Sequence, residues 1–151
     1  MLCPVWKSPG QRIISASFDK ILTVWVGNGL IRTLKGHSGV VTGCAFSAEG
    51  HFIVSASQGK TLKVWDVWTG GLIRTLNGHF DAITACAISA DGRFIASASS
   101  DKSLKVWETA SGHCLATLPV DAPLLDCAWF PDGERLIAVG TAGIYWLKWE
   151  K

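Results

Sequence analysis

His79, Ser97 and Asp101 are the residues of this chain whose types and spacing most invite a chemical interpretation. A histidine, a hydroxyl and a carboxylate are the components of a nucleophilic triad, in which the imidazole accepts the hydroxyl proton and the carboxylate orients the imidazole. Ser97 and Asp101 are four positions apart, and Trp107 follows six positions later. Whether these side chains can do such chemistry depends on the elements that carry them.

A pattern of roughly 40 residues recurs along the chain and supplies those elements. Trp25, Trp65 and Trp107 close equivalent segments at spacings of 40 and 42 residues. The units that begin at His37 and His79 each contain four short apolar runs, separated by turns that contain Gly, Asp or Ser. Such runs between such turns predict four β-strands in each unit and no helix.

Two kinds of dipeptide recur in register with these strands. Gly36-His37 and Gly78-His79 form one kind, and Trp65-Asp66 with its variant Trp107-Glu108 forms the other. A period of this length with both pairs resembles the WD-repeat family of β-propellers. The resemblance covers nearly the whole chain and implies an all-β propeller. In the detailed sequence of their strands and turns, the repeats are similar to the C-terminal sensor propellers of large signalling ATPases.

The resemblance divides residues 1–151 into four blades of one propeller domain, which amounts to half a ring. The blades are expected at about 1–37, 38–79, 80–119 and 120–151, with four strands in each of the first three and three in the last. Rings of this family typically have about seven blades, so four fit a closed ring poorly. Two open blade faces would leave large apolar surfaces in water.

Three arrangements would cover these faces: a second copy of the chain, the remainder of a longer propeller, or a different partner. Closed cyclic symmetry satisfies both faces with one repeated contact and needs no second gene product. We therefore expect a homodimer in which two chains complete an eight-bladed ring.

The resemblance also gives His79, Ser97, Asp101 and Trp107 a structural role. In WD repeats the matching Trp, Ser, His and Asp form a buried hydrogen-bond chain. Such a network leaves no free nucleophile, so we predict no catalytic residue and no enzyme activity. The other units hold incomplete sets: His37, Ser55 and Trp65 with Gly59 at the acid position, then Ser15, Asp19 and Trp25 without a histidine, then Val120, Ala138 and Ala142.

Composition excludes several other classes. The chain is 48% hydrophobic and 17% charged with a net charge of +2, and its Lys and Arg residues are scattered, which predicts neither nucleic-acid nor membrane binding. It has no apolar run of the roughly 18 to 20 residues that span a bilayer, and its start lacks the features of a signal peptide, so we expect a cytoplasmic protein.

The cysteines do not have the spacing of metal ligands. The sequence contains no Cys-x-x-Cys pair of the kind that binds zinc, and we predict no metal or cofactor. Cys44, Cys86 and Cys127 share one repeat position and are expected to be small buried hydrophobes.

Partners of WD repeats commonly bind the narrower top face of the ring, and the resemblance places that face on definite positions of this chain. The matching residues are Leu2, Phe18, Val40, Thr42, Gln58, Ala82, Thr84, Ser100, Pro123, Leu125 and Thr141. This set is uncharged and weakly polar, which suits a protein or peptide better than a phosphate or a nucleic acid. Phe18 is the expected anchor, or else packs at a blade seam.

The sequence therefore predicts a non-catalytic scaffold or sensor module for protein–protein interaction. A small-molecule or carbohydrate-binding propeller is the alternative, with pockets between blades and faint support from the aromatic residues. Trp146 and Trp149 lie near the unfinished outer edge of the last blade, where burial at a subunit or partner contact is favoured over ligand stacking.

Overall fold

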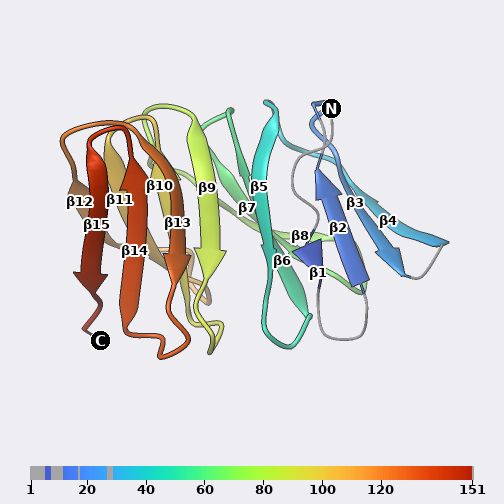
Figure 1. Cartoon of the computed structure of the whole chain (residues 1–151). Coiled ribbons are helices and arrows are strands. Elements are labelled where there is room, and N and C mark those ends of the chain that lie inside the picture. Colours follow the sequence, from blue (N-terminus) through green and yellow to red (C-terminus); the bar gives the residue numbers. More distant parts are fainter. Residues whose placement is uncertain (1–5, 8–11, 17, 27–28, 151) are drawn as a thin grey trace.

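A computed structural model describes residues 6–7, 12–16, 18–26 and 29–150. These residues form fifteen β-strands in four antiparallel sheets, and the described part of the chain contains no helix. Three sheets have four strands, the last has three, and within each sheet the strands follow chain order. The sheets stand in a row that follows the sequence (Figure 1). The predicted all-β fold, with four blades of four, four, four and three strands, is confirmed, whereas completion of a ring by a second chain stays a prediction.

The strands are five or six residues long, apart from a two-residue first strand. The first sheet contains β1 (Trp6–Lys7), β2 (Arg12–Ala16), β3 (Leu22–Val26) and β4 (Gly29–Leu34). The second contains β5 (Val41–Phe46), β6 (Phe52–Ser57), β7 (Leu62–Asp66) and β8 (Leu72–Leu76). The third contains β9 (Ile83–Ile88), β10 (Phe94–Ser99), β11 (Ser103–Glu108) and β12 (Cys114–Pro119). The fourth contains β13 (Leu124–Trp129), β14 (Arg135–Gly140) and β15 (Gly143–Lys148). The exact boundaries expected for the four blades stay a prediction.

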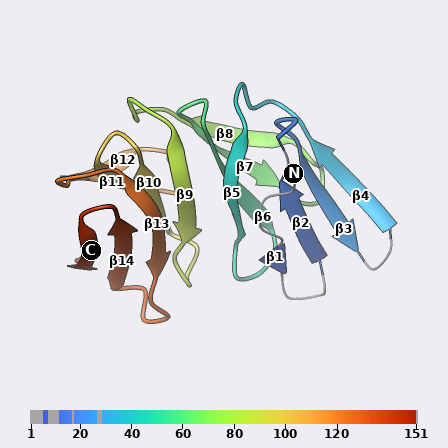
Figure 2. The ribbon, with the colours of Figure 1, turned by 45° about the horizontal axis from the view of Figure 1, so that its top comes forward.

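The core lies between the sheets rather than within any one of them. One apolar cluster joins the first sheet to the second, a second cluster joins the second to the third, and a third joins the third to the fourth. Strands in the middle of the second and third sheets are therefore largely buried on both faces, and all six residues of β10 are buried. This explains why these strands have nearly continuous apolar sequences instead of an alternating pattern. Figure 2 shows the resulting stack of twisted sheets.

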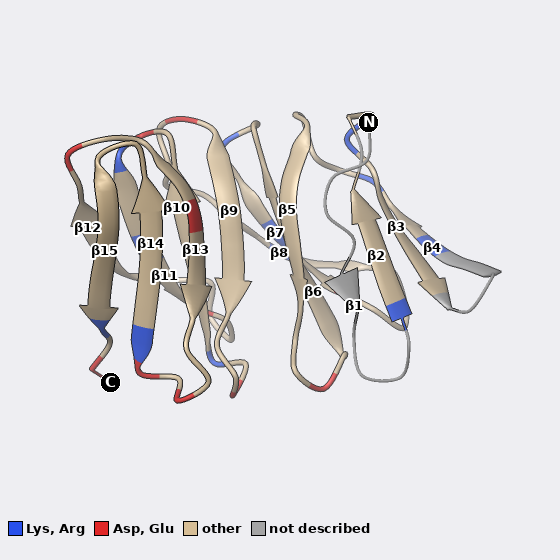
Figure 3. Cartoon of the chain, in the orientation of Figure 1, with Lys and Arg blue, Asp and Glu red and all other residues tan. Residues whose placement is uncertain are grey.

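Each repeat also reproduces its turns. Gly50, Gly92 and Gly133 lie in equivalent hairpin turns with φ of 74, 75 and 70°, a region that glycine enters without steric cost. Charged residues concentrate in these turns and at the strand ends, while the strands themselves are largely uncharged (Figure 3).

Candidate functional site

The third sheet carries the complete set of His, Ser, Asp and Trp. His79 lies in the loop before β9, Ser97 in β10, Asp101 in the β10–β11 turn and Trp107 in β11. Trp107 Nε1 donates to Ser97 Oγ over 2.9 Å, and His79 Nε2 lies 2.7 Å from the same oxygen. His79 Nδ1 lies 2.8 Å from Asp101 Oδ2. The four side chains form one continuous chain of hydrogen bonds from strand β11 to the loop.

Proton positions in this chain follow from what each group can donate. Ser97 Oγ accepts the indole hydrogen, so its own hydrogen is available to His79 Nε2, and Nδ1–H then donates to Asp101. Asp101 also accepts hydrogen bonds from the Phe80 amide at 3.0 Å and from the Ser103 hydroxyl at 2.5 Å. Every member of the network therefore has a partner.

Electrostatics fix the charge state of the network. Burial lowers the pKa of His79, although its hydrogen bond to Asp101 opposes the shift, so the imidazole is neutral at neutral pH. Burial acts to raise the pKa of Asp101, but the hydrogen bonds from Ser103, Phe80 and His79 outweigh it and the pKa falls to about 2. Ser97 is 0% exposed, so no substrate reaches its hydroxyl in this structure.

The second sheet repeats this arrangement without the acid. His37 Nε2 lies 2.6 Å from Ser55 Oγ, and Trp65 Nε1 donates to the same oxygen over 2.9 Å. His37 Nδ1 is buried, and among the residues that the structure describes it has no hydrogen-bond partner. Burial, with a smaller contribution from the charge of Lys63, lowers the pKa of His37 to about 4. Gly59 stands at the acid position.

The first sheet retains the strand part of the arrangement only. Trp25 Nε1 donates to Ser15 Oγ over 3.1 Å, and Trp25 is 37% exposed, whereas Trp65 and Trp107 are buried. Asp19 Oδ1 accepts the Ile21 amide across the β2–β3 turn at 3.3 Å. The sheet face that carries Trp25 is covered by no other sheet within the described residues, which accounts for its exposure.

The residues assigned to the top face by resemblance come together at one end of the stack, the upper end in Figure 1. The backbone amide of Gln58 donates to Val40 O, that of Ser100 to Ala82 O and that of Thr141 to Pro123 O, at 2.9, 2.9 and 3.2 Å. Phe18 and Leu125 are 48% and 57% exposed. Leu2 lies outside the described residues.

Thr42 and Thr84 of this set are engaged in contacts between sheets. Thr42 Oγ1 donates to Ile83 O over 2.6 Å, and Thr84 Oγ1 donates to Leu124 O over 2.9 Å. Each hydroxyl therefore connects its own sheet to the first strand of the next. The recurrence of Thr at one repeat position was the available signal for this contact. Leu125 occupies that position in the fourth sheet and has no hydroxyl with which to make this contact.

Three lysines that the sequence reasoning missed lie beside this set. Lys20, Lys60 and Lys102 occupy equivalent turn positions, have φ of 71, 72 and 66°, and are exposed. A lysine in this left-handed region is uncommon, and its threefold recurrence shows that the turn geometry is shared. The uncharged residues of the top end are thus flanked by a cation in each of the first three sheets.

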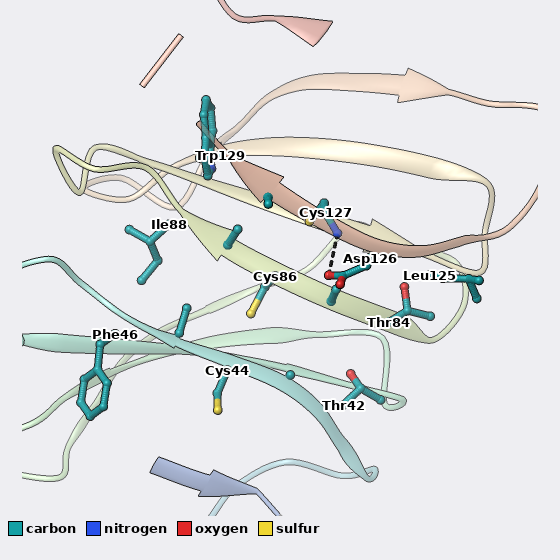
Figure 4. Close-up of a pocket in the computed structure, with 15 residues that line it drawn as sticks. Thr42, Cys44, Phe46, Thr84, Cys86, Ile88, Leu125, Asp126, Cys127 and Trp129 are labelled. Atoms are coloured by element: carbon teal, nitrogen blue, oxygen red, sulfur yellow. Dashed lines mark hydrogen bonds between the residues drawn. The ribbon is translucent and has the colours of Figure 1, made fainter. Parts of the chain in front are cut away.

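A pocket of about 530 Å³ opens along the inner strands β5, β9 and β13 (Figure 4). Its wall consists mainly of small side chains, with the thiols of Cys44 and Cys86 beside it and Asp126 as its acidic residue. Burial raises the pKa of the Cys86 and Cys127 thiols, which therefore stay protonated at neutral pH.

Within the described ranges no cluster of three or more His, Cys, Asp or Glu residues is placed to hold a metal ion. The same part of the chain has no helix long and apolar enough to cross a membrane.

The stacked antiparallel sheets repeat one Trp–Ser contact, and in two of them a loop histidine contacts the same serine. This arrangement defines a repeat protein of the β-propeller class. The family described as WD domain, G-beta repeat matches residues 28–66 and 70–108, which is just over half of the 151 residues. The chain therefore belongs to the WD-repeat family.

Several relatives share part of this sequence. It is 43% identical over 65 residues to the small ribosomal subunit protein RACK1 of Saccharomyces cerevisiae, a match that covers 38% of this chain and 20% of the relative. It is 35% identical over 65 residues to the nuclear distribution protein nudF of Aspergillus terreus, covering 42% and 15%. It is 33% identical over 66 residues to the F-box-like/WD repeat-containing protein TBL1Y of Homo sapiens, covering 43% and 13%. The matches span a fifth or less of these relatives.

Proposed function

We propose that this chain is a non-catalytic module that binds a protein or peptide through the top end of its stacked sheets. The observation that carries the proposal is the set of exposed, uncharged residues, Phe18, Gln58, Leu125 and Thr141 among them, which the repeat brings to one end. Membership of the WD-repeat family supports the protein-binding role, and the name of the ribosomal relative describes a component of a larger assembly. A sensor role and a cytoplasmic location are parts of this proposal.

A peptide-display selection on the purified chain tests this function. Peptides that bind the top end should lose most of their affinity for the Phe18→Ala and Leu125→Asp variants, because both changes remove exposed apolar surface there. Leu115→Asp is the matched control, since Leu115 is 44% exposed on β12, away from that end. Selected peptides that bind both top-end variants as well as the unaltered chain would contradict the proposal.

We further propose that a second copy covers the open faces of the first and fourth sheets. On the fourth sheet Ile144 and Trp146 are 61% and 66% exposed, while Leu104 and Val106, their equivalents in the third sheet, are 2% and 4% exposed. An apolar sheet face that is buried in one repeat and exposed in the next is typical of a surface that a partner covers. Light scattering over a tenfold dilution should give about twice 16.2 kDa, and a stable monomer would contradict the dimer.

A further inference from the structure

The turn between β7 and β8 presents an exposed tryptophan on a fixed backbone. Trp68 is 62% exposed, whereas an indole is normally largely buried. Asp66 Oδ1 accepts the amides of Trp68 and Thr69 over 2.8 and 3.0 Å, which holds the turn from within. The amide of Val67 donates to the carbonyl of His51 over 3.0 Å and joins this turn to the β5–β6 turn, at the end opposite the top end (Figure 1). The indole is therefore held in position without being covered.

Two arginines of the first sheet reach across the seam to this residue. The guanidinium carbon of Arg12, on β2, lies 4.4 Å from the centroid of the Trp68 ring, a cation–π contact. Arg12 Nη1 also donates to the carbonyl of Gly50 over 3.1 Å. Arg32, on β4, donates to the carbonyl of Trp68. Both arginines are the blue segments of β2 and β4 in Figure 3. Two cations therefore converge on one exposed aromatic residue.

The seam between the second and third sheets has the same backbone geometry without this group. A Cβ atom at Gly70 would lie 3.0 Å from Arg32 Cδ. At the next seam a Cβ atom at Gly112 would lie 3.1 Å from Arg74 Cδ, so both turns approach the preceding sheet equally closely. The positions of Arg12, Arg32 and Trp68 are occupied there by Phe52, Arg74 and Ala110. The exposed indole and the second arginine are therefore not needed to pack a seam.

The charges of the two arginines are not neutralised within the described ranges. Neither Arg12 nor Arg32 forms an ion pair with a carboxylate there. Arg32 Nε is buried and, among the same residues, has no hydrogen-bond partner. A guanidinium has five N–H donors in a planar fork that matches a carboxylate. The pair is therefore complementary to an acidic group supplied from outside.

Apolar side chains continue this surface on the outer strand. Leu72 and Ile73 begin β8 directly after the turn, and each is 47% exposed. Arg12 covers only one face of the indole, so the exposed part of Trp68 includes the other face. We call the five residues Trp68, Arg12, Arg32, Leu72 and Ile73 the Trp68 surface.

We propose that the Trp68 surface binds an acidic segment of a partner protein, in which a carboxylate lies next to an aromatic or aliphatic side chain. The carboxylate accepts hydrogen bonds from Arg12 and Arg32, and the apolar side chain packs on the open face of the indole. Tryptophan and arginine are the side chains most enriched among residues that dominate binding energy. Because the turn is already ordered, little entropy is lost when it binds.

A chain of phosphates fits this surface less well than a single carboxylate does. Glu49 and Asp66 lie in the two turns that meet here, and their negative charges would repel neighbouring phosphates. The exposed Leu72 and Ile73 also favour hydrocarbon over a sugar–phosphate backbone. The surface lies at the end opposite the top end, so this proposal does not depend on the function proposed for that end.

A peptide-display selection with a depletion step tests the proposal. A random library of linear peptides is selected on the 151-residue chain and depleted on the Trp68→Ala variant. We expect the remaining peptides to be enriched in Asp or Glu beside Phe, Tyr, Trp or Leu. They should bind Trp68→Ala about tenfold or more weakly in an anisotropy titration. Trp68→Ala removes mostly exposed surface, and its melting temperature serves as the check that it folds.

Four further variants locate the binding. Arg12→Gln and Arg32→Gln should each weaken it by about fivefold and reduce its dependence on salt. Phe80→Ala is the matched control, because Phe80 is an aromatic residue 86% exposed in the loop before β9, at the top end. It should leave binding unchanged. Leu125→Asp should also leave it unchanged, which separates this surface from the one proposed for the top end.

Three outcomes would overturn the proposal. The first is a depleted library with no peptide left, or with peptides that carry no excess of acidic residues. The second is an equal loss of binding for Phe80→Ala and Trp68→Ala. The third is an oligothymidylate that binds the unaltered chain more tightly than the selected peptides and loses this affinity with Trp68→Ala, which would make the surface one for single-stranded nucleic acid.

Discussion

The second and third sheets contain the same Trp, Ser and His in nearly the same geometry, and they differ at the fourth position of the network, the acid. The His–Ser contacts are 2.6 and 2.7 Å, both Trp–Ser contacts are 2.9 Å, and both His–Trp ring separations are 6.2 Å. The third sheet adds Asp101, and the second has Gly59 instead. The acid is therefore not needed to place the histidine against the serine. What it supplies is a partner for Nδ1 and an anchor for the loop.

The second sheet holds its loop by a different contact. A Cβ atom at Gly39 would lie 2.5 Å from Gly59 N, and one at Gly59 would lie 2.5 Å from Ser38 Oγ. The loop and the turn therefore approach backbone to backbone, in a space that a side chain at either position would fill. In the third sheet the corresponding residues are Asp81 and Asp101, and side-chain hydrogen bonds connect loop and turn. Two different pairs of residues therefore hold the loop and the turn together at equivalent places.

Removal of the histidine should have the largest effect, and it should differ between the sheets. We expect His79→Ala to lower the free energy of unfolding by about 3 kcal/mol, because the buried Ser97 hydroxyl loses its acceptor, Asp101 loses one of its hydrogen bonds, and the imidazole leaves a cavity. His37→Ala should cost about 2 kcal/mol, since only the Ser55 hydroxyl loses its acceptor and no carboxylate loses a hydrogen bond. Urea denaturation of the two variants measures the difference. Equal losses would mean that Asp101 adds nothing to the network.

Removal of the charge on the acid should have the next largest effect. Asp101→Asn keeps one acceptor for Phe80 or Ser103 but presents an amide N–H₂ to a site built from donors, so we expect a loss of about 2 kcal/mol. Asp81→Asn is the control, because Asp81 is exposed in the neighbouring loop and should change stability by less than about 0.5 kcal/mol. A stability for Asp101→Asn within the range of that control would contradict the assigned role.

Installation of the acid in the second sheet should fail. Gly59→Asp brings a carboxylate toward the unpartnered His37 Nδ1, but its Cβ meets Ser38 Oγ and the Gly39 backbone. We expect a net loss of about 1.5 kcal/mol from the overpacked junction. Gly59→Ala carries the same Cβ without the charge, so the difference between the two melting temperatures isolates the hydrogen bond. A Gly59→Asp variant more stable than the unaltered chain would show that the two loops are interchangeable.

The sequence predicted much of this architecture because the repeat signals are local. Trp and Ser recur at fixed positions on adjacent strands, and the turn glycines mark where strands end. The number of strands in each sheet followed from the apolar runs between these turns and from the alignment of the end units to the clear repeats. The Gly39–Gly59 junction could not be predicted, since a glycine in sequence does not show which backbone approaches it. The hydroxyl contacts of Thr42 and Thr84 were missed for a related reason: they depend on how one sheet is rotated against the next.

The smallest expected effect is a difference between His37 and His79 in how each makes the stability depend on pH. Burial lowers the pKa of both imidazoles, to about 4 for His37. As the pH falls through about 6.5, these histidines therefore bind protons in the unfolded chain but stay neutral in the folded chain. Stability is therefore full above pH 6.5 and declines as the pH falls toward the folded pKa. We expect a loss of about 1 kcal/mol between pH 7 and 5.5 from His37.

Asp101 makes the contribution of His79 smaller, because the carboxylate opposes the fall in the pKa of that imidazole. A His37→Gln variant should accordingly flatten the pH dependence of the melting temperature in this range more than His79→Gln does. Asp101 itself acts lower on the scale: its depressed pKa contributes stability above pH 4 that is lost as the pH falls toward 2. If the two glutamine variants gave parallel curves between pH 7 and 5.5, the missing acid would have no electrostatic consequence for the second sheet.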